Sequence, residues 1–285
     1  MVFLPRDEHG VVDARRIFEE ECAACGIPLL FWRTVPVDPH DLGSTAQACM
    51  PTIMQAFLGR PDSIEAGDEF ERALYVCRRS IEKRADAEPS LDGKIFYICS
   101  MSARTIVYKG MLVATQMRRF YIDLNDAAVK TAVALVHSRY STNTTPSWER
   151  AHPNRLIIHN GEINTLKGNV NWIRAREPNL YSPVLQHDLE RVLPIINREG
   201  SDSAILDNVL EFLVQNGRPL TRAVSMLMPE PWDHNDALTP ERRSYDAYQS
   251  MLMEPWDGPA AIAFTDGRTL GAASTVTACA RLAIT

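Results

Sequence analysis

A strand-like run near the middle of the chain ends in polar residues and a glycine. The run "RLIIHNGEIN" covers residues 155–164, and its apolar letters LII are followed directly by His159, Asn160 and Gly161. A buried side-chain amide costs free energy unless its hydrogen bonds are satisfied. A glycine beside it lets a ligand approach the backbone N–H groups closely. The run therefore predicts a sheet in which one strand end carries a polar site.

The other patterns along the chain place strands and helices in blocks rather than in strict alternation. The dipeptide Asp266-Gly267 lies between two short apolar runs and is the strongest hairpin signal. Blocks of strands and helices favour the α+β class with a mostly antiparallel sheet. Strand-like runs cover residues 27–37, 51–59, 94–102, 104–110, 130–142, 155–164 and 260–272, and helical patterns cover residues 13–26, 68–84, 166–177, 203–217, 220–228 and 244–253.

Two of the helical patterns have clear apolar faces and ends. The predicted helix 68–84 places Phe70, Leu74, Cys77 and Ile81 on one face, and the predicted helix 203–217 does the same with Leu206, Val209, Leu210 and Leu213. Gly26 and Gly217 are placed to end the helices that precede them. Residues 38–50 are predicted to form a loop.

The bulk composition is that of an ordinary globular protein. Hydrophobic residues make up 45% of the 285 residues, and the net charge of −6 gives no basic surface for nucleic acid or an anionic membrane. No apolar run approaches the roughly 18 residues of a membrane helix, and "MVFLPRDEHG" does not resemble a secretion signal. Six cysteines in a chain of this length do not form a disulfide framework. We therefore expect a reduced, cytoplasmic protein.

Cysteines and histidines give no metal motif. Cys22 and Cys25 form a C-x-x-C inside a predicted helix, without the second pair that a zinc site needs. Two part-buried helical thiols explain them better. No spacing places His137, His152 and His159 on one face, so structural histidines are the simpler interpretation, and no metal is expected.

Three polar positions have both a structural and a functional interpretation. Arg139 is a surface arginine at a strand end, or a guanidinium that clamps a ligand carboxylate. Asp202 is a helix N-cap, or the acceptor for an α-ammonium group. Asn160 and Gly161 form a turn, or an oxyanion hole made from an amide N–H and a backbone N–H. The three functional interpretations together describe an α-amino acid with a reactive side-chain carbonyl, which fits glutamine and the hydrolysis of its amide.

Longer stretches resemble a known family. The stretches "VALVHSRYSTNTTPSWERAHPNRLIIHNGEINTLKGNVNWI", "GSDSAILDNVLEFL" and "MLMEPWDGPAAIAFTDGR" are similar to the glutaminase part of glutamate synthase large subunits, which are class II (N-terminal nucleophile) glutamine amidotransferases. The resemblance covers the chain up to about Ala273. It implies a four-layer αββα sandwich of antiparallel sheets, incomplete here. It also implies that Arg139 holds the glutamine carboxylate, that Asn160 and Gly161 form the oxyanion hole, and that Asp202 binds the α-amino group.

The resemblance also implies parts that this sequence does not contain. In the family the nucleophile is an N-terminal cysteine, whereas Met1 is followed here by Val2. We therefore expect an amidotransferase fragment that releases no ammonia from glutamine by itself. The FMN- and iron–sulfur-binding synthase region, which would receive the ammonia for 2-oxoglutarate, lies outside this chain, as does the small subunit of the enzyme.

The last residues depart from the family pattern. We expect residues 1–273 to form a partial class II amidotransferase domain and residues 274–285, "STVTACARLAIT", to be a tail outside the family. A one-base shift of the reading frame near Ala273 converts this tail into Leu-Asp-Arg-Asn-Gly-Leu-Arg-Pro-Ala-Arg-Tyr, which resembles the family's continuation. The tail is therefore interpreted as frameshifted, and no function is assigned to Cys279.

Two other functions are weighed against ammonia assimilation. A non-catalytic amino-acid-binding or interaction module derived from this domain would keep the pocket without the chemistry. A phosphoribosylamine-forming amidotransferase is disfavoured by "HSRYSTNT" and "MEPWDGP", because other class II amidotransferases share only the shorter arginine, "HNG" and "SD" motifs.

Overall fold

The structure is a computed structural model, and it describes residues 1–140, 145–233 and 238–274. These residues form two compact units. Unit 1 contains Met1–Ala134, Ser138–Tyr140 and Thr145–Arg155, and unit 2 contains Leu135–His137 and the described residues from Leu156 onward. The sheet in each unit is antiparallel, which confirms the predicted α+β class.

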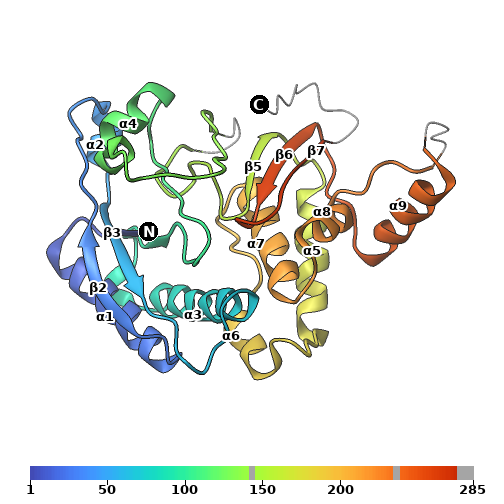
Figure 1. The fold of residues 1–285 in the computed structure, drawn as a ribbon, viewed down its shortest axis with the longest axis horizontal. Helices are drawn as coiled ribbons and strands as arrows, with labels where there is room; N and C mark the ends of the chain where they lie inside the picture. Colours follow the sequence, from blue (N-terminus) through green and yellow to red (C-terminus); the bar gives the residue numbers. More distant parts are fainter. Residues whose placement is uncertain (141–144, 234–237, 275–285) are drawn as a thin grey trace. The chain divides into compact units, whose positions relative to one another are not determined.

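Unit 1 is built around a four-stranded sheet in the order β2-β3-β1-β4. Figure 1 labels two of these strands, β2 and β3. Val2 and Leu4 point to one face of the sheet, where two long helices cover them, while Phe3 points to the other face, where it packs in a second cluster with Trp148. Alternation along a strand explains why one short strand serves two cores. The elements of unit 1 are β1 (Val2–Leu4), α1 (Glu8–Ala24), β2 (Leu29–Thr34), α2 (Ser44–Ala48), β3 (Thr52–Leu58), α3 (Asp68–Asp86), η1 (Pro89–Leu91), β4 (Tyr97–Ile98), η2 (Ala114–Gln116), α4 (Met117–Phe120) and η3 (Ile122–Asn125).

Unit 2 contains a three-stranded sheet in the order β5-β6-β7. The hairpin predicted at Asp266-Gly267 is confirmed, since β6 pairs with β7 and the Asp266 carboxylate accepts the N–H groups of Arg268 and Thr269. The elements are β5 (Ile157–Gly161), α5 (Leu166–Arg176), η4 (Glu177–Asn179), η5 (Gln186–Asp188), α6 (Leu189–Val192), α7 (Asp202–Gln215), α8 (Leu220–Leu227), α9 (Pro240–Leu252), β6 (Ala260–Thr265) and β7 (Leu270–Ser274).

The predicted faces and ends of the long helices are confirmed. All eight apolar residues assigned to the faces of α3 and α7 are buried. Gly26 has φ +68°, and the N–H groups of Gly26 and Ile27 bond to the carbonyls of Ala23 and Cys22, which is a Schellman motif. Gly217 likewise has φ +85° after α7. The start of α1 was predicted too late, because the Asp7 carboxylate caps the helix by accepting the Gly10 N–H at 2.8 Å.

Two expected strands are absent from the described residues. The run 104–110 forms no strand because serine hydroxyls, rather than a neighbouring strand, accept its N–H groups: Ser100 Oγ accepts from Val107 and Ser102 Oγ accepts from Thr105. Residues 130–140 of the expected strand 130–142 also pair with no other described strand, and residues 141–142 lie outside the described residues. Val136 in this run is 73% exposed. An apolar sequence alone therefore does not make these residues pair as a strand.

The expected loop 38–50 contains the short helix α2. A contact distant in sequence fixes it, since the buried Trp148 donates its Nε1–H to the carbonyl of Ala46 at 3.1 Å. The tail 274–285 lies outside the described residues apart from Ser274, which ends β7. The domain boundary at residue 273 therefore stays a prediction.

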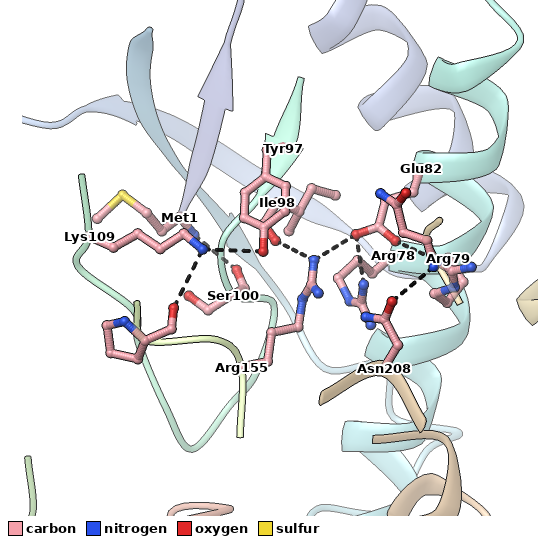
Figure 2. A network of polar contacts seen from close by, with 12 residues as sticks. Met1, Arg78, Arg79, Glu82, Tyr97, Ile98, Ser100, Lys109, Arg155 and Asn208 are labelled. Carbon is pink, nitrogen blue, oxygen red and sulfur yellow. Dashed lines mark hydrogen bonds and ion pairs between the residues drawn. The ribbon is translucent and has the colours of Figure 1, made fainter. Parts of the chain in front are cut away.

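A network of cations around Glu82 ties α3 to the sheet of unit 1 (Figure 2). The Glu82 carboxylate accepts hydrogen bonds from Arg78, Arg79 and Arg155 at 2.7–2.9 Å. Arg155 also donates to the carbonyl of Ile98 in β4 at 2.7 Å. Because Arg78 is 1% exposed and Glu82 is 17% exposed, these charges depend on one another for solvation.

Candidate active site

The polar end of β5 has a backbone that only glycine accommodates. Gly161 has φ +126°, and a Cβ built on it would lie 1.9 Å from the carbonyl oxygen of Pro259, just before β6. Gly258 shows the reciprocal restriction, with φ +151° and a Cβ that would meet the carbonyl of Glu162 at 2.1 Å. Two glycines thus allow the chain after β5 and the chain before β6 to cross closely.

The side chains at this end alternate between the two faces of the strand. Ile157 and His159 are buried, and α7 packs on β5, where the Asp207 carboxylate accepts the N–H groups of Leu156 and Ile157. Asn160 is exposed. Its amide donors are therefore available to a ligand, while its neighbours are held in the core.

Asp202 is linked to the turn that follows Gly161. Its Oδ2 accepts the N–H of Ile163 at 3.2 Å, and its Oδ1 accepts the N–H of Ser203 at 2.7 Å. The structural interpretation of Asp202 as the N-cap is wrong, because Ser201 caps α7 with its hydroxyl and Asp202 is the first helical residue. A carboxylate has about four acceptor positions, so Asp202 can still accept from a ligand.

Arg139 lies in a different unit from these residues. It is exposed and belongs to unit 1, whereas Asn160, Gly161 and Asp202 belong to unit 2. Unit 2 therefore brings together three of the four predicted site residues, Asn160, Gly161 and Asp202. Within the described residues no group of three His, Cys, Asp or Glu side chains is arranged to hold a metal ion.

Sequence reasoning missed the residues that support the site. Asp207, which anchors β5, and Ser201, which caps α7, were not singled out, although Asp207 is an acid between the apolar residues of a predicted helix. Gly258 was also missed, and its signal was the Gly-Pro pair directly before the first strand of the hairpin.

His159 is a buried imidazole directly before the exposed amide. It is 4% exposed, and its Nε2 has no hydrogen-bond partner among the described residues. Burial lowers the pKa of His159, and this effect exceeds the opposing attraction of Asp202, while His137 adds to the lowering. The imidazole behind the site is therefore neutral at physiological pH.

We expect the two histidines His159 and His40 to titrate on opposite sides of pH 6.5. Hydrogen bonding and attraction to Asp38 raise the pKa of the exposed His40, which makes it an internal reference. Because the folded pKa of His159 lies below its unfolded value of 6.5, the unfolded chain binds this proton first, and the stability of unit 2 falls as the pH drops below 6.5. An NMR titration of the imidazole protons measures both values, and a His159 midpoint above that of His40 would contradict the assignment.

Comparison with known proteins places the chain in a family. The family model described as glutamine amidotransferases class-II matches residues 1–275. The chain therefore belongs to the class II glutamine amidotransferases. No helix in the described part of the chain has the length and apolar character needed to cross a membrane.

Several similar proteins are glutamate synthases. The chain is 49% identical over 276 residues to the glutamate synthase [NADPH] large chain of Bacillus subtilis, with 95% of this chain and 18% of the relative covered. It is 42% identical to the chloroplastic ferredoxin-dependent glutamate synthase of rice, with 95% and 17% covered, and 44% identical to the glutamate synthase [NADH] of Saccharomyces cerevisiae, with 95% and 13% covered. The chain thus spans less than a fifth of the length of these relatives.

Proposed function

We propose that this chain supplies the glutaminase site of a glutamate synthase. The site would hydrolyse glutamine to glutamate and ammonia, and the ammonia would pass to 2-oxoglutarate. The observation that carries the proposal is the end of β5, where the exposed Asn160 precedes a glycine with φ +126° and the next turn is bound by Asp202. The similarity to glutamate synthases over 95% of the chain supports the same function.

Each predicted residue has a role in this proposal. The Asn160 amide and the Gly161 N–H would stabilise the negative charge on the amide oxygen of glutamine when a nucleophile attacks its carbon. Asp202 would accept from the α-ammonium group, and Arg139 would bind the α-carboxylate through two parallel N–H donors. Binding both ends of the amino acid would hold the side-chain amide at the oxyanion donors.

The nucleophile and the synthase machinery would come from outside these residues. Each of the five described cysteines belongs to unit 1, and none carries the α-amino group that activates an N-terminal thiol: Cys22, Cys25, Cys49, Cys77 and Cys99. The partners would be the rest of a glutamate synthase large subunit, which would hold FMN and an iron–sulfur cluster, and its small subunit. No disulfide joins the five described cysteines, which agrees with a cytoplasmic location.

A hybrid enzyme tests the proposal. Residues 1–275 replace the matched segment of the Bacillus subtilis large chain, which keeps its own preceding residues, and NADPH oxidation is measured with glutamine or with ammonium as the nitrogen donor. We expect the hybrid to use glutamine, and the 285-residue chain alone to release no ammonia. A hybrid that uses ammonium but not glutamine would contradict a glutaminase and favour a non-catalytic amino-acid-binding module.

A further inference from the structure

Two buried thiols from different helices of unit 1 touch each other. Cys22 in α1 and Cys77 in α3 are both 0% exposed, and their Sγ atoms lie 3.7 Å apart. The two helices pack side by side in the core cluster that covers the sheet (Figure 1). No step of the proposed glutaminase reaction uses either thiol.

We propose that Cys22 and Cys77 are a dithiol pair that a peroxide converts into a disulfide joining α1 to α3. The contact is already as close as two unbonded sulfurs allow. A disulfide requires about 2 Å between the sulfurs, so side-chain rotation and a small helix shift would complete the bond. The two cysteines lie 55 positions apart in the sequence, and the disulfide would close the chain between them into a covalent loop.

The reaction balances with hydrogen peroxide as the oxidant. The thiolate of one cysteine attacks the O–O bond, giving a sulfenic acid and one water after proton transfer. The second thiol then attacks the sulfenic sulfur, forms the S–S bond and releases another water. The two sulfurs are oxidised by two electrons in total and one peroxide is reduced.

The position of Cys22 gives the oxidant a route into the core. Buried cysteines are ordinarily inert, so the reaction needs a local opening. Cys22 lies in the last turn of α1, which ends at Ala24, and helix ends open at far lower free energy than the whole fold. Cys25, the C-cap residue of α1, lies three positions after Cys22 and is half-buried. The pair therefore stays reduced under ordinary conditions and responds to sustained peroxide.

Mass spectrometry of the peroxide-treated full chain tests the proposal. The reduced chain is incubated with hydrogen peroxide, alkylated in denaturant and digested without reductant. We expect a cross-linked peptide that joins Cys22 to Cys77 and is lighter by two hydrogens, and dithiothreitol should restore both thiols. The melting temperature should rise by about 5–10 °C on oxidation and return on reduction.

Cysteine variants separate this pair from the other thiols. Cys77→Ala should remove both the cross-link and the rise in melting temperature, whereas Cys25→Ser and Cys49→Ser should keep both. A cross-link between Cys22 and Cys25, or further oxidation of Cys22 and Cys77 without a cross-link, would overturn the proposal. Complete alkylation of Cys22 and Cys77 after the exposed Cys49 has been oxidised would also overturn the proposal.

Discussion

Gly161→Ala should lower the free energy of unfolding of unit 2 by about 3 kcal/mol or more, because it adds two separate penalties. An alanine at φ +126° is strained by its backbone conformation alone, and its Cβ would meet the Pro259 carbonyl oxygen at 1.9 Å. Backbone rather than a flexible side chain blocks this position. Relief would therefore require the crossing between the ends of β5 and β6 to open.

Hydrogen exchange of the β6 amides measures this effect in unit 2 alone. The matched control is Gly168→Ala in α5, where a Cβ meets nothing within 4 Å. Replacing a helical glycine with alanine should stabilise that variant by about 0.5–1 kcal/mol. Equal protection of the β6 amides in Gly161→Ala and the unsubstituted chain would show that the crossing is not a rigid feature.

Glu82→Gln should destabilise unit 1 by about 3–5 kcal/mol at neutral pH, the range found when one partner of a buried ion pair is removed. The carboxylate accepts from three arginines, one of which is 1% exposed. The glutamine keeps the shape of the side chain but removes the negative charge that the three guanidinium groups share. Urea unfolding followed by circular dichroism gives the difference.

The Glu82 carboxylate also makes the stability of unit 1 fall at acid pH. Burial raises the pKa of Glu82, but Arg78, Arg155 and Arg79 lower it from 4.5 to about 2. Because the folded pKa of Glu82 is depressed, the carboxylate contributes fully to the stability of unit 1 above pH 4.5. This contribution is lost as the pH falls towards 2. The loss amounts to about 3 kcal/mol.

A variant with an exposed ion pair serves as the control for Glu82. Glu20 pairs with Arg16 and Arg84 at the surface, so Glu20→Gln should change stability far less and keep the acid dependence. Glu82→Gln should flatten the fall in stability between pH 4.5 and 2. An unchanged acid profile in Glu82→Gln would show that another carboxylate is responsible.

The regular elements were largely predictable, because their signals are local. The face of α3 and the ends at Gly26 and Gly217 follow from helical spacing and glycine conformation. The exceptions depend on contacts distant in sequence. Residues 104–110 have strand-like letters, yet hydroxyl groups of Ser100 and Ser102 take their N–H groups.

The site was predictable only in part. Asn160 and Gly161 follow a strand signal, and the structure places them at the end of β5 as expected. The capping role was assigned one residue too late, because Ser201 and Asp202 both have side chains that cap helices and only the backbone conformation distinguishes them. Arg139 was expected at the end of a strand, and residues 130–140 form no strand because no described strand pairs with them.

The most direct test of the proposed glutaminase site is the variant Asn160→Ala in the hybrid synthase. Loss of one oxyanion donor should lower glutamine-dependent NADPH oxidation by about 10²–10³-fold and leave ammonium-dependent oxidation unchanged. Asn179→Ala, which removes an exposed amide in η4, is the matched control and should change neither rate. A loss smaller than about tenfold, or an equal loss with both nitrogen donors, would contradict an oxyanion hole at Asn160.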